Sequence, residues 1–378
     1  MRSFLAVVAL GAALVLLGCR GPGVSALRGE VASPEVPAKD TEPPSGTSAL
    51  AGDAATAPGK ARVPSPLAFI RGGNVCLLVP DNPEAIPITT QGNCRTPAWS
   101  RDGRRLAYLH DLAATVEDVR GEDRPVSEVW VTDASGESRR RVPLGERTTI
   151  VQMVWTPQGD SLMVTTPHAA TSDGAWRLGL DGQSHGEPVG CNRLQACDRA
   201  ESPYILEEHN YTRGWGAEEV FLVGPDLKHT AYATDMTDLM PTISPRLDWA
   251  GLVQPDDPDR PWSDQSDRLY LAATPRFEAP DWLSKNVGKG PEESPASMNA
   301  QVPSGSLLMF ESARSLHSLA FSWDGKYLAF VAEERSAKGG TVQCKLYVLS
   351  VPDGAVKLIV EDARDPAWKP TRSAGVSG

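Results

Sequence analysis

Short runs of alternating apolar and polar residues, separated by polar turns, fill most of the chain from residue 65 onward. One phrase, residues 96–109 (TPAWSRDGRRLAYL), consists of an apolar run, a turn with Asp-Gly and a second apolar run. Such alternation predicts half-buried strands, and Asp-Gly between two of them predicts a β-hairpin. Related phrases occupy 153–164 and 319–330, with a fainter copy at 242–252. The pattern predicts an all-β protein built from repeated hairpins.

Each hairpin is followed by a further strand with its own turn, as at 128–132 and 345–349. Four short antiparallel strands per repeat are typical of one blade of a β-propeller. The spacing of 88 residues between Trp155 and Ile243 fits two blades, and the less obvious one would contain 219–223. Residues 277–306 are rich in Pro, Ser, Gly and charge, which indicates an insertion in a later blade.

The two ends of the repeat region complement each other. Residues 365–370 form a first strand with no second strand after it, whereas 66–71 form a second strand with no first strand before it. Joined in one sheet they would close the ring and remove an exposed edge. We therefore expect a six-bladed β-propeller of four-stranded blades, and favour it over a β-sandwich of repeated hairpins.

The repeat resembles the TolB-type (WD40-like) propeller repeat, in which an apolar strand, Ser-Pro-Asp-Gly and a Leu-Ala-Phe-like strand follow one another. The matching phrases here are SRDG at 100–103 with LAYL, and SWDG at 322–325 with LAF. The resemblance covers most of 66–370 and implies a propeller that binds proteins. TolB-type proteins engage a peptidoglycan-associated lipoprotein and carry an α/β domain before the propeller. A tether takes that place here, so no residue role is carried over.

The N-terminus has the pattern of an export signal. Met1 and Arg2 precede an apolar stretch at 4–17, which is short of the roughly 20 residues of a membrane-spanning helix. Cys19 follows Gly18 as in the bacterial lipobox, which it resembles. We expect cleavage of a signal peptide, 1–18, and acylation of Cys19, which would anchor the protein to a membrane. Arg20 in place of Asp favours the outer membrane, with the protein facing the periplasm or the cell surface.

Composition then sets the expected boundaries. Residues 19–64 contain almost no large apolar side chains, so they predict a disordered tether. The propeller is expected at 65–371, followed by a disordered tail at 372–378. The net charge of −11 argues against a nucleic-acid partner, which would need a basic face.

No catalytic or metal-binding motif stands out, and the six histidines are scattered. We therefore expect binding rather than catalysis, with no cofactor and no metal. Five carboxylates at 256–267 are interpreted as a solvated acidic loop rather than a calcium site, because the ligand spacing is missing. The alternative function is an envelope enzyme, a glycan lyase or hydrolase or a peptidase-like protein. A cluster of His, Tyr and Arg at the central channel would favour it.

The expected partner is a protein or peptide of the cell envelope, bound by loops that break the repeat. The first such loop, 190–216, carries three candidate binding residues: Tyr211, Arg213 and Trp215. A disulfide between Cys191 and Cys197 is the first candidate pairing there, and Cys76 with Cys94 is the second. The second loop is the insertion, with Trp282 and Lys285. The aromatic residues that recur in the repeat are interpreted as packing between blades: Trp99, Trp155, Phe321 and Trp368.

Overall fold

The computed structural model describes residues 62–371 except 120, 145–147, 168–172, 210–217, 234–240, 256–265, 279–301, 313–314, 336–341 and 352. The chain divides into one unit at 1–55, which lies outside the described residues, and a second unit at 56–378. The predicted signal peptide, Cys19, most of the tether and the tail at 372–378 therefore also lie outside them. Within the described part of the chain, no helix is long and apolar enough to cross a membrane.

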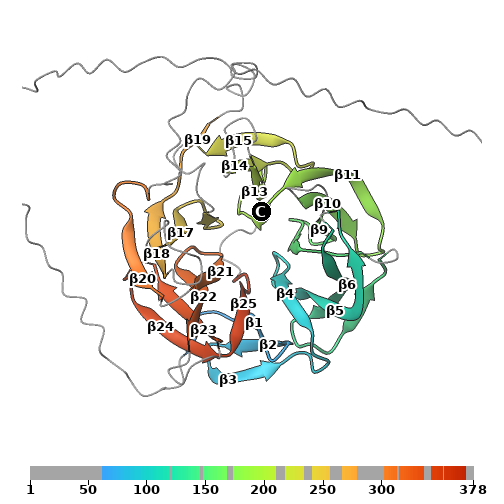
Figure 1. Cartoon of the computed structure of the whole chain (residues 1–378), viewed down its shortest axis with the longest axis horizontal. Helices are drawn as coiled ribbons and strands as arrows, with labels where there is room; N and C mark the ends of the chain where they lie inside the picture. Colours follow the sequence, from blue (N-terminus) through green and yellow to red (C-terminus); the bar gives the residue numbers. More distant parts are fainter. Residues whose placement is uncertain are drawn as a thin grey trace, which may run out of the picture. The chain divides into compact units, whose positions relative to one another are not determined.

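Six antiparallel sheets stand around a common centre, as blades of a propeller (Figure 1). From the innermost strand outward, blade 1 contains β25 (Ala363–Trp368), β1 (Leu67–Arg71), β2 (Asn74–Val79) and β3 (Asn82–Pro87). Blade 2 contains β4 (Cys94–Trp99), β5 (Arg105–Glu117), β6 (Asp123–Asp133) and β7 (Arg139–Val142). Blade 3 contains β8 (Gln152–Trp155), β9 (Ser161–Pro167), β10 (Asp173–Gly179) and β11 (Ser184–Cys191).

Blades 4 to 6 complete the ring in the same order. Blade 4 contains β12 (Arg193–Ala196), β13 (Tyr204–His209), β14 (Glu218–Val223), β15 (His229–Ala233) and β19 (Phe277–Glu278). Blade 5 contains β16 (Thr242–Ile243), β17 (Trp249–Pro255), β18 (Asp267–Ala273) and β20 (Leu307–Glu311). Blade 6 contains β21 (Ser315–Phe321), β22 (Tyr327–Arg335), β23 (Val342–Ser350) and β24 (Val356–Glu361).

The predicted all-β six-bladed propeller is confirmed, including its closure. The C-terminal strand β25 pairs with the N-terminal β1 in blade 1, where Leu67 lies opposite Trp368. The less obvious blade in the long gap is blade 4, and β14 covers the predicted 219–223. Blade 4 differs from the others because the first residues of the insertion add a fifth strand. Glu278 of β19 lies opposite Tyr232 of β15, the outer strand of that blade.

The Ser-x-Asp-Gly turn joins the first two strands of a blade through its side chains. The Ser100 hydroxyl donates to Asp102 over 2.6 Å and accepts from the backbone N–H of Arg105 over 2.9 Å. Gly103 has a φ of 65°, the left-handed region that favours glycine. The same contacts recur in blade 6, where the Ser322 hydroxyl donates to Asp324. The repeat in the sequence therefore marks a turn that holds both strands in register.

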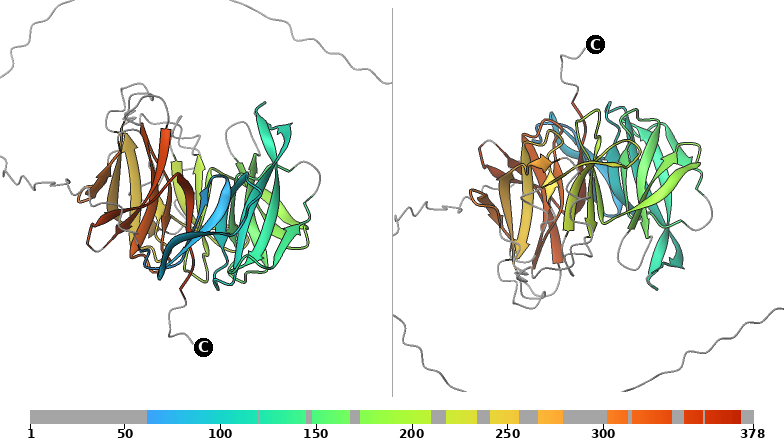
Figure 2. Two further views of the ribbon diagram at one scale, coloured as in Figure 1. Left: turned by 90° about the horizontal axis from the view of Figure 1, so that it is seen from below. Right: turned by 90° about the horizontal axis from the view of Figure 1, so that it is seen from above.

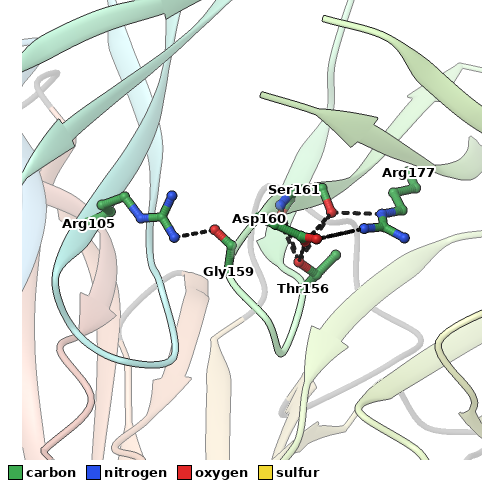
Figure 3. A network of polar contacts seen from close by, with 6 residues as sticks. All are labelled: Arg105, Thr156, Gly159, Asp160, Ser161 and Arg177. Atoms are coloured by element: carbon green, nitrogen blue, oxygen red, sulfur yellow. Dashed lines mark hydrogen bonds and ion pairs between the residues drawn. The ribbon is translucent and has the colours of Figure 1, made fainter. Parts of the chain in front are cut away.

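Blade 3 uses a variant of this turn (Figure 3). The hydroxyls of Thr156 and Ser161 both donate to Asp160, over 2.9 and 2.8 Å. The Arg177 guanidinium donates to the Ser161 hydroxyl over 2.7 Å and forms an ion pair with Asp160. From blade 2, Arg105 donates to the carbonyl oxygen of Gly159. The turn of one blade is thus bound to the blade beside it.

The recurrent aromatic residues pack between blades, as predicted. Trp99, Trp155, Phe321 and Trp368 are each at most 6% exposed. Trp155 in β8 donates its indole N–H to the carbonyl oxygen of Ala98 in β4, over 2.9 Å. Trp368 in β25 makes the same contact with Ala320 in β21, over 3.0 Å. Each contact links the innermost strands of two adjacent blades.

Candidate functional site: the central channel

The ring has two distinct faces, defined by the direction of the innermost strands. We call the face where these strands begin the entry face, and the face where they lead into the Ser-x-Asp-Gly turns the turn face. The long β5–β6 hairpin extends from the entry face, since Cys94 lies opposite His110 and the pairing continues to Glu117 and Asp123 (Figure 2). The entry face is therefore not a flat ring surface.

Two cavities follow the axis of the ring, one towards each face. The cavity towards the turn face has a volume of about 190 Å³ and is lined mainly by apolar and aromatic side chains, among them Trp99, Trp155, Trp323 and Trp368. The cavity towards the entry face is larger, about 400 Å³, and takes polar side chains from several blades: Thr96, Gln152, Arg193, Gln195, Thr242, Ser318 and Asp365. Such a volume lies within the range of pockets that hold ligands. The entry-face cavity is the candidate functional site.

Three of these polar residues lie at the same position of the repeat and share an unusual backbone. Thr96, Ser318 and Asp365 have φ values of 50°, 53° and 52°, in the left-handed region. In β4, β21 and β25 the register with the next strand shifts at this position, as in a β-bulge. Left-handed residues other than glycine cost conformational energy and cluster at ligand sites. Here the bulge changes the course of three adjacent strands that line the cavity.

Asp365 connects these three strands. Its Oδ1 accepts from the Ser318 hydroxyl over 3.2 Å, and its Oδ2 accepts from the backbone N–H of Thr96 over 3.3 Å. The carboxylate thus lies between blades 6 and 2 while belonging to blade 1. One negative charge is therefore held at the wall of the cavity by neighbours on both sides.

The opposite wall carries a positive charge. Arg193 belongs to β12 in blade 4, which lies opposite blade 1 in the ring of six blades. Its guanidinium donates to the Thr242 hydroxyl over 2.6 Å. The neighbouring Gln195 is fixed at both ends of its amide, because Nε2 donates to the Pro241 carbonyl and Oε1 accepts from the Ile243 N–H, each over 3.0 Å. The cavity thus presents oriented polar groups and charges of opposite sign.

Replacement of Asp365 by Ala should destabilise the channel. The Ser318 hydroxyl and the Thr96 N–H would each lose an acceptor, so we expect Asp365→Ala to lower the free energy of unfolding by roughly 1–3 kcal/mol more than a control. The control is Asp362→Ala, since Asp362 has a φ of 62° and is exposed. Both variants place Ala in the left-handed region, so this backbone cost is the same in each. The difference between their free energies of unfolding, measured by chemical denaturation, therefore reports the loss of the two hydrogen bonds. Equal losses would show that Asp365 does not connect the blades.

Comparison with known proteins gives a match at the level of structure. No family model matches the sequence, and no curated protein matches it. TolB from Acinetobacter baumannii superposes with a TM-score of 0.51 over 81% of this chain and 67% of that chain, at 14% identity. In fold, the chain is similar to TolB.

Other solved propellers match with lower scores. A TolB-type protein from Agrobacterium tumefaciens gives a TM-score of 0.45 at 11% identity, over 79% of this chain and 88% of that chain. The tricorn protease gives 0.39 at 12% identity, over 79% of this chain and 29% of that chain. The predicted TolB-like propeller is confirmed as a fold by the blade topology and by the match to the Acinetobacter baumannii structure.

The binding residues predicted for this TolB-like propeller lie outside the described residues: Tyr211, Arg213, Trp215, Trp282 and Lys285. The strands that flank 210–217 are described. His209 at the end of β13 lies opposite Glu218 at the start of β14, on the entry face. The described ends of these two strands thus lie at the face with the larger cavity.

The predicted disulfide between Cys191 and Cys197 is not formed, and this expectation is corrected. Both residues are free and buried, as are Cys76 and Cys94, the second candidate pair. Cys191 ends the outer strand of blade 3 and packs in the same hydrophobic cluster as Leu206. Cys197 follows the innermost strand of blade 4 and packs in a different hydrophobic cluster. Burial raises the pKa of the Cys191 thiol to about 12 and that of Cys197 to about 11, so both are protonated.

The acidic loop is also only partly described. Residues 256–265 lie outside the described residues. Of its carboxylates, Asp267 in β18 accepts from the backbone N–H of Leu316 over 2.8 Å and so joins blade 5 to blade 6. This one carboxylate has a structural contact rather than a purely solvated position.

Sequence reasoning missed the residues of the cavity wall. Thr96 and Asp365 stand in the repeated phrases Thr-Pro-Ala-Trp and Asp-Pro-Ala-Trp, and Ser318 stands in Ser-Leu-Ala-Phe. The polar residue two positions before the alanine of each phrase was the available signal. Among the described lining residues of the two cavities there is arginine but no histidine or tyrosine. The described residues that line the two cavities therefore do not form the cluster of His, Tyr and Arg that would have favoured an enzyme.

Proposed function

We propose that this protein is a membrane-tethered binding module of the cell envelope, whose propeller holds an extended segment of a partner protein at the entry face. The observation that carries the proposal is the cavity of about 400 Å³ with Asp365 and Arg193 on opposite walls. An extended peptide offers N–H donors and C=O acceptors along its length. Such a ligand would meet oriented acceptors and donors on both sides of the channel.

The surroundings of the cavity fit a protein better than a small molecule. The β5–β6 hairpin extends from the same face, and its Leu112 and Val119 are 37% and 58% exposed. Exposed apolar side chains beside a polar pocket are typical of surfaces that bind proteins. The hairpin would add contact area outside the channel, beside the inserted segment.

The proposed location rests on the sequence. A positive n-region, an apolar stretch and Gly18-Cys19 support export and acylation at Cys19, and Arg20 supports an outer-membrane anchor. The segment up to about residue 64 would then separate the ring from the membrane surface. The partner would accordingly be a protein of the periplasm or the cell surface.

Charge reversal in the cavity tests the proposal. Arg193→Glu would place a second negative charge across from Asp365, so we expect it to reduce capture of the partner at least tenfold in crosslinking from intact cells. Lys228→Glu is the matched control, because Lys228 is 84% exposed in the β14–β15 turn and changes the net charge equally. Thermal unfolding of both variants checks that the ring is intact.

The outcomes separate the alternatives. A defined envelope protein that is captured by the native chain and Lys228→Glu, but not by Arg193→Glu, would support binding at the entry face. Capture that is unaffected by Arg193→Glu but lost when 279–301 is deleted would move the binding surface to the insertion. No capture, together with turnover of glycans or peptides by the purified protein, would overturn the proposal in favour of an enzyme.

A further inference from the structure

Three side chains with metal-binding atoms meet on blade 6: His317, Glu333 and Cys344. They come from the three adjacent strands β21, β22 and β23. Glu333 lies directly opposite Cys344, and His317 lies opposite Val331, two residues before Glu333. Because side chains alternate along a strand, all three project from the same face of the sheet. That face is turned towards blade 1, since Val331 and Cys344 pack in the same hydrophobic cluster as Leu67.

The donor atoms are close enough to share one ion. The Nε2 of His317 lies 3.5 Å from the Oε1 of Glu333, and the three donor atoms lie within 4.8 Å of one another. Bond lengths of 2.0–2.3 Å at tetrahedral angles place the ligand atoms of a zinc ion about 3.5 Å apart. One separation already has this value, and small side-chain rotations would bring Cys344 to it.

The hydrogen bonds of His317 orient the ring for such a role. Its Nδ1 lies 2.9 Å from the Ser318 hydroxyl, which itself donates to Asp365 over 3.2 Å. The hydroxyl has one proton, so it accepts from Nδ1–H, and the neutral ring then carries its lone pair on Nε2. That lone pair faces a carboxylate oxygen 3.5 Å away. A metal ion placed between these two atoms would bind both of them.

We propose that His317, Glu333 and Cys344 bind a zinc ion, with a water molecule as the fourth ligand. Imidazole, thiolate and carboxylate together are a ligand set that zinc accepts, whereas calcium and magnesium prefer oxygen alone. His317 and Glu333 are 36% and 27% exposed in their side chains, which leaves a path for the ion and the water. The Ser318 hydroxyl, itself hydrogen-bonded to Asp365, would hold the Nδ1 side of the imidazole while Nε2 binds the zinc ion.

The zinc site would act on the candidate peptide site through Asp365, although it does not depend on that function. Zinc would fix His317, and through Ser318 it would fix the carboxylate at the cavity wall. Burial and the negative charge of Glu333 raise the pKa of the Cys344 thiol. The ion must therefore displace a proton from sulfur, which limits its affinity.

Cobalt(II) is the probe for this site, because a thiolate–cobalt bond gives a near-ultraviolet absorption band. We expect the full chain with Cys19→Ser, kept reduced, to show this band at one equivalent of cobalt and to lose it when zinc is added. Zinc should also raise the thermal midpoint, because an ion that binds only the folded state stabilises it.

Variants assign the ligands. Cys344→Ser should remove the band and weaken zinc binding at least about 100-fold, and Glu333→Gln should weaken it about 10-fold. Ser318→Ala should keep the band and weaken binding by roughly 10-fold to 100-fold, as expected for an outer contact. Cys76→Ser is the matched control, since Cys76 is a buried thiol in the same hydrophobic cluster and should leave the titration unchanged. An absorption spectrum that cobalt does not change, or a band that persists in folded Cys344→Ser, would overturn the proposal.

Discussion

A chain that ends at Asp362, and therefore lacks β25, should not form the native ring. β25 supplies the innermost strand of blade 1, and its Ala363 and Trp368 are 0% and 3% exposed. Without it β1 becomes an unpaired edge, and the contacts of β25 with the neighbouring blades 6 and 2 are lost. We expect loss of the cooperative thermal transition and rapid digestion in limited proteolysis.

A chain that ends at Thr371 is the control for this truncation. It keeps β25 and the hydrogen bond from the Lys369 N–H to the Pro66 carbonyl, 2.9 Å long. Its thermal midpoint should equal that of the full chain. A cooperative transition in the shorter chain would mean that the ring forms without β25. The pairing of the two ends of the chain would then not be what completes the ring.

Trp155→Ala should cost about 3–5 kcal/mol in the free energy of unfolding, the range for deletion of a large buried aromatic side chain. Trp155 is 4% exposed and packs in the cluster between blades 2 and 3. Its ring also lies under the guanidinium of Arg105, 4.8 Å from the ring centroid. Trp155→Phe keeps most of the packing but leaves the Ala98 carbonyl without its indole donor, and should cost only about 1–2 kcal/mol.

Trp323→Ala is the control for the same measurement. Trp323 also lines the turn-face cavity but is only partly buried, in the turn of blade 6. Its removal should cost no more than about 1 kcal/mol. If both tryptophans gave the same small loss by denaturant titration, Trp155 would not be a packing residue between blades.

The sequence predicted the parts of the fold that local chemistry determines. The Ser-x-Asp-Gly turn is visible because Asp102 and Gly103 are required by the hydrogen bonds and the backbone of the turn. Blade 4 was harder to recognise because the segment between its first two strands, 197–203, lacks the Ser-x-Asp-Gly phrase. The fifth strand β19 was not predicted, because its two residues depend on the free edge of β15 rather than on their own pattern.

The candidate site was less predictable because it depends on contacts between blades. Asp365 and Ser318 are 47 residues apart, and neither stands in a motif that signals their hydrogen bond. The disulfide prediction relied on the short separation of Cys191 and Cys197, which hides the change from the outer edge of one blade to the inner edge of the next. Likewise, the ligands of the proposed zinc site come together only through the register of three strands.

The position of β1 also determines how the ring would respond to tension. β1 lies between β25 and β2, so a force on the N-terminal segment must slide it past two strands at once. A force on the C-terminus would act on β25, which has a neighbour within its sheet on one side alone. A ring held by its N-terminus can therefore bear more load before a strand is extracted than the same ring held by its C-terminus. With the proposed anchor at Cys19, a pulling force between the membrane and a bound partner would act on this mechanically stronger end.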